Sequence, residues 1–205
     1  MRSELIAHRI NTVSELLALP AGVGVELDIR DHGDNLVLQH DPFLGGESFA
    51  SFLEKYKKRG TLILNIKSER IEERVLTLVH QFQIKDYFLL DSSFPMIYKL
   101  SSLGEKNIAL RFSEIEGIDT IRNWKGKVRW IWIDCFTKFV LTKELEREFH
   151  DLGYKICIVS PELQGRPEEI CEYLSVIKKE NIVIDAVCSK IKNHTVWSAL
   201  NESDN

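Results

Sequence analysis

The sequence lacks most features that mark disulfide-rich or zinc-binding chains. It contains only four cysteines in 205 residues, and none of them forms a Cys-x-x-Cys pair. Three of the four lie within apolar runs, where cysteine usually acts as a small buried hydrophobe. The spacing of Cys135, Cys157, Cys171 and Cys188 therefore argues against a structural zinc site and against a disulfide framework.

Long apolar stretches and a basic excess are also missing. No run approaches the roughly 18 apolar residues of a transmembrane helix, and no apolar signal-peptide core precedes the first predicted strand. We therefore expect a cytoplasmic protein. The formal net charge is −4, whereas nucleic-acid-binding domains usually carry a basic excess, so we expect no nucleic-acid partner. The composition leaves a homodimer open.

Apolar, β-branched runs alternate with helix-like segments along the whole chain. The runs that predict strands cover residues 4–8, 23–30, 61–67, 87–91, 107–112, 128–136, 155–160 and 182–189. Between them lie helix start signals, such as Asn11 before a helix that Pro20 ends, Ser48 before 49–58 and Ser68 before 69–83.

Eight strands, each followed by a helix or a long connection, predict a single α/β domain over residues 1–205, folded as a (β/α)8 barrel. An open doubly wound sheet is the alternative. It would need a glycine-rich phosphate-binding turn after the first strand, and Arg9-Ile10-Asn11 contains no glycine.

Polar side chains gather at the ends of the first predicted strands. His8 ends the first strand, Glu26 and Asp28 lie late in the second, and His40 follows a hairpin-like extension at 31–35. Because parallel strands of a barrel end at one mouth, we expect these side chains to meet there.

The alternation of side chains along a strand predicts which of them face inward. Val25, Leu27 and Ile29 would pack beneath the helices, which turns Glu26 and Asp28 toward the barrel interior. Inward carboxylates are costly unless they are paired or bind a metal. Asn65 and Lys67 repeat the same two-residue spacing at the end of the third strand.

Taken singly, each of these residues has an ordinary structural explanation, such as a surface histidine or a solvated carboxylate. The combination is more specific. Two imidazoles can exchange protons near neutral pH, and two carboxylates on one face of a strand can hold a cation. This set suits the metal-assisted cleavage of a phosphodiester.

Three segments of the chain carry a family resemblance. Ile-Ala-His-Arg (6–9), Val-Glu-Leu-Asp-Ile-Arg (25–30) and His-Asp (40–41) resemble the glycerophosphodiester phosphodiesterases, within the phospholipase-C-like phosphodiesterase barrels. The resemblance is strong over residues 4–44, moderate at 64–67 and faint at 89–94 and 184–190.

The resemblance implies roles residue by residue. His8 and His40 match the acid–base pair, Arg9 and Lys67 match the groups that bind the phosphate, and Lys67 also supports catalysis by stabilising negative charge. Glu26 and Asp28 match two ligands of a divalent cation, Mg²⁺ or Ca²⁺. The implied substrate is a small glycerol or sugar phosphodiester, and one implied route passes through a cyclic phosphate.

Three departures from the family pattern stand out. Ile10 occupies the position of a glycine, and Asn65 that of the third acidic metal ligand, a glutamate in the family. An asparagine can bind calcium through its carbonyl oxygen but brings no charge. The segment at 42–61, after His40-Asp41, is also short, which implies a smaller lid over the site.

Several polar residues follow the later predicted strands and are candidates to line the mouth. They are Asp91, Arg111, Asp134, Glu162, Arg166 and Lys190. Glu162 is a candidate to replace the missing carboxylate at the metal, although carboxylates near helix starts are also common without such a role.

Two other functions are consistent with the sequence. Asn65 and Ile10 leave open a non-catalytic relative that binds a phosphorylated ligand or a protein partner. A barrel isomerase or aldolase-like enzyme that uses Lys67 as a Schiff base has less support, because it does not use the paired histidines and carboxylates.

Overall fold

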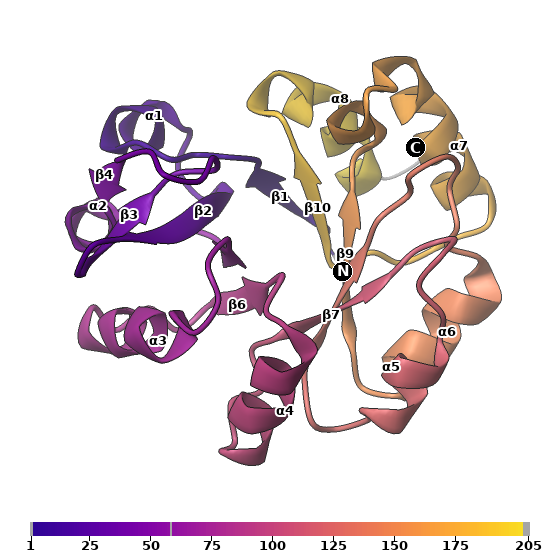
Figure 1. Ribbon diagram of the computed structural model, residues 1–205. Coiled ribbons are helices and arrows are strands. Elements are labelled where there is room, and N and C mark those ends of the chain that lie inside the picture. Colours follow the sequence, from indigo (N-terminus) through magenta and orange to yellow (C-terminus); the bar gives the residue numbers. More distant parts are fainter. Residues whose placement is uncertain (1, 58, 203–205) are drawn as a thin grey trace.

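Eight parallel strands form the centre of the molecule in the computed structural model, which describes residues 2–57 and 59–202 (Figure 1). They are β1 (Glu4–Ala7), β2 (Gly24–His32), β5 (Leu62–Ile66), β6 (Tyr87–Leu90), β7 (Ala109–Phe112), β8 (Trp130–Ile133), β9 (Lys155–Val159) and β10 (Ala186–Ser189). Each lies within or close to one of the eight predicted runs. The predicted α/β class is therefore confirmed.

The parallel strands pair in a continuous order that curls the sheet. The order runs from β6 through β5, β2, β1, β10, β9 and β8 to β7. At the remaining junction, β6 and β7 meet through one isolated bridge between Leu89 and Ile108. The sheet is thus curled and barrel-like, and the fully paired barrel remains a prediction at this junction.

A short antiparallel extension follows β2. The strand β3 (Asn35–Leu38) pairs with the end of β2 through a two-residue turn, and β4 (Glu47–Ser48) pairs with β3. Gly33 opens the turn at φ +60°, a conformation that glycine adopts without strain. This extension is the hairpin predicted at 31–35, and it places His40 beyond its second strand.

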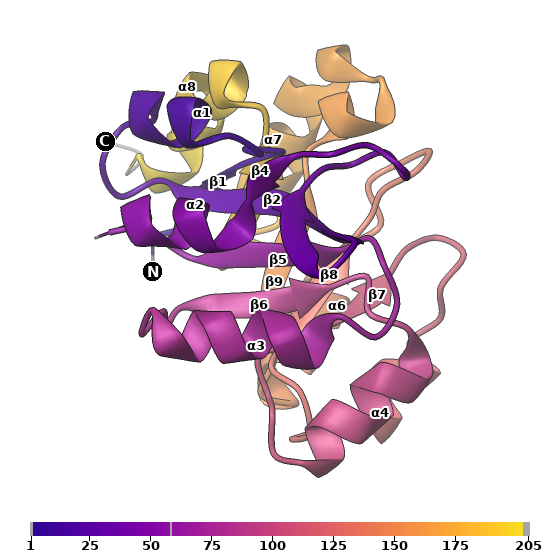
Figure 2. The ribbon, with the colours of Figure 1, turned by 60° about the vertical axis from the view of Figure 1, so that its left-hand side comes forward.

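The helices lie on the outer side of the curled sheet (Figures 1 and 2). They are α1 (Val13–Ala18), α2 (Phe49–Lys55), α3 (Glu72–Gln81), α4 (Phe94–Ser102), α5 (Asp119–Asn123), α6 (Lys143–Asp151), α7 (Ile170–Lys179) and α8 (His194–Trp197). Short 3-10 turns flank the last two, at Pro161–Gln164, Pro167–Glu169, Ile191–Asn193 and Ser198–Asn201. None of the helices in the described ranges is long and apolar enough to cross a membrane.

Two predicted helix starts were wrong. The N-cap of α1 is Thr12, whose hydroxyl accepts from the amide of Glu15 in a capping box, so Asn11 does not cap the helix. The third helix begins at Glu72 and not near Ser68, because Arg70 takes a left-handed backbone angle of φ +68°. That angle is incompatible with a right-handed helix at this residue.

Alternating side chains of the strands form two apolar clusters. The larger cluster packs between strands and helices and includes Val25, Leu27 and Ile29. The smaller cluster fills the inside of the curled sheet and includes Ile63 of β5. The predicted orientation of β2 is therefore confirmed, and Glu26 and Asp28 belong to the opposite, inner face.

Candidate active site

Two buried carboxylates lie in the part of β2 that pairs with β5. Glu26 and Asp28 are each only 1 % exposed, and they share one face of the strand. Burial first, and then the negative charge of Asp28, raise the pKa of Glu26 to about 7. Ionisation of both groups in a buried place is unfavourable unless positive charges lie nearby.

The loop after β1 holds both carboxylates in place. The amide of Arg9 donates to Glu26 Oε2 at 2.7 Å, and Arg9 takes a left-handed backbone angle of φ +56°. Asn11 donates from Nδ2 to Asp28 Oδ2 at 3.0 Å and accepts from the amide of Asp28 at 2.9 Å. The left-handed angle falls on Arg9, so Ile10 needs no glycine-like backbone and packs in the core instead.

Asn65 lies between the two carboxylates. Register pairs it with Asp28 across β2 and β5, and its Nδ2 donates to Glu26 Oε1 at 2.9 Å and to Asp28 Oδ1 at 3.4 Å. Its carbonyl oxygen, Oδ1, is buried and has no hydrogen-bond partner in the part of the chain that the structure describes. A turn of the amide about its last torsion would direct this oxygen toward the carboxylates.

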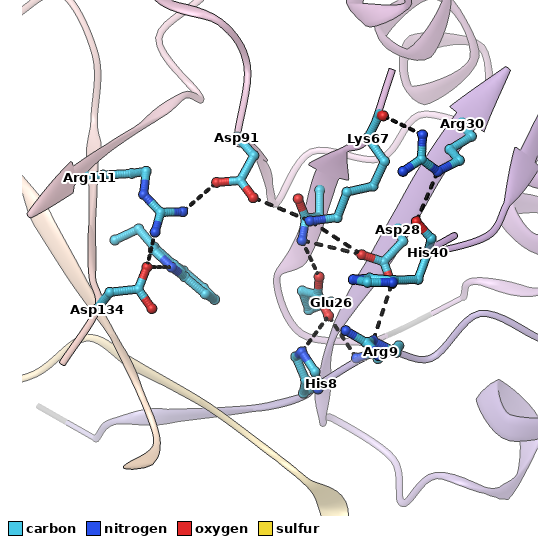
Figure 3. A network of polar contacts seen from close by, with 12 residues as sticks. His8, Arg9, Glu26, Asp28, Arg30, His40, Lys67, Asp91, Arg111 and Asp134 are labelled. Atoms are coloured by element: carbon cyan, nitrogen blue, oxygen red, sulfur yellow. Dashed lines mark hydrogen bonds and ion pairs between the residues drawn. The ribbon is translucent and has the colours of Figure 1, made fainter. Parts of the chain in front are cut away.

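Two cationic side chains approach the same pair. Lys67 Nζ lies 3.7 Å from Asp28 Oδ1 and 3.3 Å from Asp91 Oδ2, and Arg9 Nε lies 3.5 Å from Asp28 Oδ2. The lysine side chain is 19 % exposed and the arginine side chain 47 % exposed, so both can reach a ligand. Figure 3 shows them on opposite sides of the Asp28 carboxylate.

His8 stands at the end of β1 beside Glu26. Its Nε2 lies 3.7 Å from Glu26 Oε2, which is too long for a hydrogen bond. Burial first, and then the positive charge of Arg9, lower the pKa of His8 to about 4. The imidazole is therefore neutral at physiological pH and has a free nitrogen to accept a proton.

His40 lies on the opposite side of the site and is more open. Its side chain is 41 % exposed, and its Nδ1 is 2.8 Å from Asp41 Oδ1. Arg30 connects its loop to that of Lys67, because Nε donates to the His40 carbonyl at 2.9 Å and Nη1 donates to the Lys67 carbonyl at 2.6 Å. Figure 3 shows His8, Arg9, Lys67 and His40 grouped around the two carboxylates.

A second polar cluster continues the site across the mouth. Arg111 of β7 binds Asp91 Oδ1 at 2.6 Å and Glu116 Oε1 at 3.0 Å, and it also binds Asp134. Because Asp91 also binds Lys67, the two clusters are joined by one carboxylate (Figure 3). The structure thus brings Asp91, Arg111 and Asp134 to the mouth, as the sequence predicted.

The carboxylate of Glu162 is fixed by hydrogen bonds from residues close to it in the structure. Its oxygens accept from Ser160 Oγ, from Ser189 Oγ at 2.7 Å and from the amide of Lys190 at 3.0 Å. Burial raises the pKa of the Glu162 carboxyl, but the hydrogen bonds from Ser160 and Ser189 outweigh it and bring the pKa below its usual value. Its role as a metal ligand stays a prediction. Arg166 turns instead toward Glu169, the Cys135 carbonyl and Tyr173.

Sequence reasoning missed two residues that position the site. Asn11 was interpreted as a helix cap, although the Thr12-x-x-Glu15 pattern next to it indicated the true cap and freed Asn11 for another role. Arg30 was seen only as part of the motif at 25–30. Its contacts with two distant carbonyls depend on tertiary structure, so no local signal could have found them.

Among known proteins, solved structures resemble this chain in fold. No protein-family model matches the chain, and no curated protein matches it. One solved structure from Agrobacterium tumefaciens str. C58, assigned provisionally as a glycerophosphoryl diester phosphodiesterase, is similar at a TM-score of 0.69 and 10 % identity, over 98 % of this chain and 99 % of the other.

A second structure, a glycerophosphodiester phosphodiesterase from the same organism, is similar at a TM-score of 0.63 and 16 % identity, over 91 % of this chain and 96 % of the other. At such identities the likeness is one of fold. The architecture expected from the resemblance is thereby supported over nearly the whole chain.

Proposed function

We propose that this protein is a phosphodiesterase that uses a divalent cation, Mg²⁺ or Ca²⁺, to hydrolyse a small glycerol or sugar phosphodiester. One observation carries the proposal. The mouth of the curled sheet holds two buried carboxylates together with two histidines and two cationic side chains. The fold shared with the two Agrobacterium structures adds support.

The residues at the site fit a hard cation with oxygen ligands. Glu26 and Asp28 offer carboxylates, and the unpartnered Asn65 Oδ1 offers a carbonyl oxygen once the amide turns. Across residues 2–57 and 59–202, no three His, Cys, Asp or Glu side chains are arranged to hold a metal ion. The site therefore depends on two carboxylates and an amide. When bound, a cation would polarise the phosphoryl group and offset its charge.

The protein's own groups supply the rest of the chemistry. Arg9 and Lys67 are placed to bind the phosphate oxygens and to stabilise the charge that builds on them. The neutral His8 is suited to accept a proton from the attacking hydroxyl. Asp41 is bonded to Nδ1 of His40 and orients the ring, and His40 is suited to donate a proton to the leaving oxygen.

One observation favours a second candidate. The Nδ2 group of Asn65 already donates to both carboxylates and partly takes the place that a cation would fill. A relative that has lost catalysis, and binds a phosphorylated ligand through Arg9 and Lys67, would need no more than this arrangement.

Hydrolysis of a panel of glycerol and sugar phosphodiesters separates the two functions. We expect turnover that requires Mg²⁺ or Ca²⁺, stops with a chelator, and falls by about 10²–10⁴ in His40→Ala, the range for a general acid or base. The folded state of the variant is checked by circular dichroism. Absence of hydrolysis across the panel, together with absence of cation binding in calorimetry, would reject the enzyme in favour of the binding protein.

A further inference from the structure

A cavity of about 340 Å³ opens at the junction of β6 and β7. Phe94 and Ile97 of α4 line one side, and Ala109 and Leu110 of β7 line the other. This is the junction where the sheet is joined by a single bridge, so space exists between the two strands and their helices. The volume lies within the range of about 300–1,000 Å³ that is typical of small-molecule sites.

The cavity lies next to the residues that we assign to the phosphate. Asp91 lines the cavity, and its Oδ2 is 3.3 Å from Lys67 Nζ (Figure 3). One carboxylate therefore separates the cavity from the lysine. A diester carries two alcohol groups on its phosphorus, so one of them would face this cavity when the phosphate is bound at Lys67.

The charged groups around the cavity satisfy one another. Arg111 binds both Asp91 and Glu116, the second oxygen of Asp91 binds Lys67, and the second oxygen of Glu116 accepts from Ser113 Oγ at 2.8 Å. A charged ligand would have to break these pairs, which is costly in a partly buried place.

The remaining surface of the cavity is largely apolar, and its polar groups are the hydroxyls of Ser92 and Thr120. Phe94, Ile97, Ala109 and Leu110 offer carbon surface, which favours an apolar occupant. The hydroxyl of Ser92 also belongs to the lining, and it is buried with no hydrogen-bond partner among the described residues. Buried hydroxyls usually have a partner, so this one is suited to bond an oxygen of the ligand.

We infer that this cavity binds the second alcohol group of the substrate and selects an uncharged, largely apolar alcohol. The inference rests on the proposed phosphodiesterase function, because it takes the phosphate to lie at Lys67. It names the class of diester that the function itself leaves open.

Two bulky substitutions reduce the cavity from its open side. Thr120 is an exposed residue of the lining, and Gly117 is a lining residue whose Cβ would meet no atom within 4 Å and whose backbone is outside the left-handed region. Thr120→Trp and Gly117→Trp should therefore fold. Thr195→Trp on α8 and Ser175→Trp on α7 are controls, since both residues are exposed and neither lines the cavity.

The substrates share a glycerol phosphate and differ in the second alcohol, which is methyl, benzyl or a trimethylammonium ethyl group. In the wild type we expect kcat/KM for the benzyl diester to exceed that for the methyl diester by about tenfold or more, as apolar pocket contacts commonly give. The cationic diester should show no such gain. Thr120→Trp and Gly117→Trp should lose the benzyl preference and keep methyl turnover, whereas the controls keep both.

A binding measurement keeps this inference separate from the proposed function. Calorimetry with benzyl phosphate and methyl phosphate needs no turnover, and the benzyl compound should bind about tenfold more weakly to the two cavity variants than to the controls. If no diester is hydrolysed but this difference appears, the proposed function fails and the cavity assignment stands. If diesters are hydrolysed with no benzyl preference, or the variants bind like the controls, the cavity assignment is overturned and the proposed function stands.

Discussion

Two histidines of this protein lie beside carboxylates, at opposite ends of the strands, in contrasting electrostatic surroundings. His8 follows β1 at the mouth, 3.7 Å from Glu26. His150 of α6 lies near the starts of β9 and β10, between Glu146 at 2.8 Å and Asp185 at 3.0 Å. Burial lowers the pKa of both rings, but in His150 the hydrogen bonds that the ring donates to both carboxylates outweigh burial and raise the pKa above its usual value.

A neighbouring carboxylate therefore has different effects on the two rings, depending on whether the ring donates a hydrogen bond to it. His150 forms hydrogen bonds with both ring nitrogens, which favours its protonated form and ties α6 to the loop before β10. His8 makes no close hydrogen bond to Glu26 and has the cationic Arg9 beside it, so its ring stays neutral. In parallel barrels the mouth carries the chemistry and the opposite end carries stability. We expect the two histidines to follow that division.

The largest expected effect comes from the same substitution at both histidines. His8→Asn should lower kcat/KM by about 10²–10⁴ with little change in melting temperature, because it removes a proton acceptor and no strong contact. His150→Asn should leave kcat/KM within about threefold and lower the melting temperature. Steady-state kinetics and thermal denaturation measure both. Equal losses of activity in the two variants would contradict the division.

Asn11 tests whether the mouth also contains residues that act mainly on stability. Asn11→Ala removes two hydrogen bonds to Asp28 and leaves the carboxylate less well held, so the free energy of unfolding should fall by about 1–3 kcal/mol. Urea denaturation measures the change, with Asn35→Ala, at an exposed position that begins β3, as the control. A change no larger than that of the control would show that Asp28 is held by other groups.

Asn65 tests whether the carboxylates at the mouth bind a cation. Asn65→Glu adds a third carboxylate, so calorimetry should show about tenfold tighter binding of Mg²⁺ or Ca²⁺. Without a cation the same variant should melt at a lower temperature, because like charges are buried together. Asn65→Gln changes size without charge and serves as the control. Unchanged affinity in Asn65→Glu would argue against a cation between these residues.

The smallest expected effect is the pH dependence contributed by His150. A pKa raised by folding stabilises the protein fully below the usual histidine value of 6.5, and this contribution is lost as the pH rises through the folded-state pKa. His150→Asn should therefore cost about 1 kcal/mol near pH 6 and less at pH 9. Urea denaturation at both values measures this, with His32→Asn at the exposed end of β2 as the control. A constant difference would contradict it.

The strands and the carboxylate pair could be predicted because their signals are local. The alternation of apolar and acidic residues along β2 predicted which face carries Glu26 and Asp28. The burial of Val25, Leu27 and Ile29 in the larger apolar cluster confirms it. Contacts across the mouth could not be predicted in the same way. That Asp91 joins Lys67 to Arg111 depends on how far β5, β6 and β7 curl, which no short segment encodes.

The two wrong helix starts have a related cause. More than one residue near a predicted helix start can serve as the N-cap, and both Asn11 and Thr12 are suitable for the N-cap of α1. Tertiary contacts decided between them, since Asp28 engages the asparagine. At the third helix the left-handed Arg70 separates Ser68 from the first turn, and arginine gives no sequence signal for that conformation.

Among the described parallel strands, β6 and β7 form the most weakly paired junction of the curled sheet. Seven junctions are held by ladders of two to five residue pairs, whereas this one is held by the Leu89–Ile108 bridge, with the Leu89 amide bonded to the Asn107 carbonyl at 2.9 Å. A local opening there breaks few backbone hydrogen bonds, each of which contributes about 1 kcal/mol net. An opening at this junction would leave intact the ladders that join β2 to β1 and β5 and that hold Glu26, Asp28 and Asn65 in register.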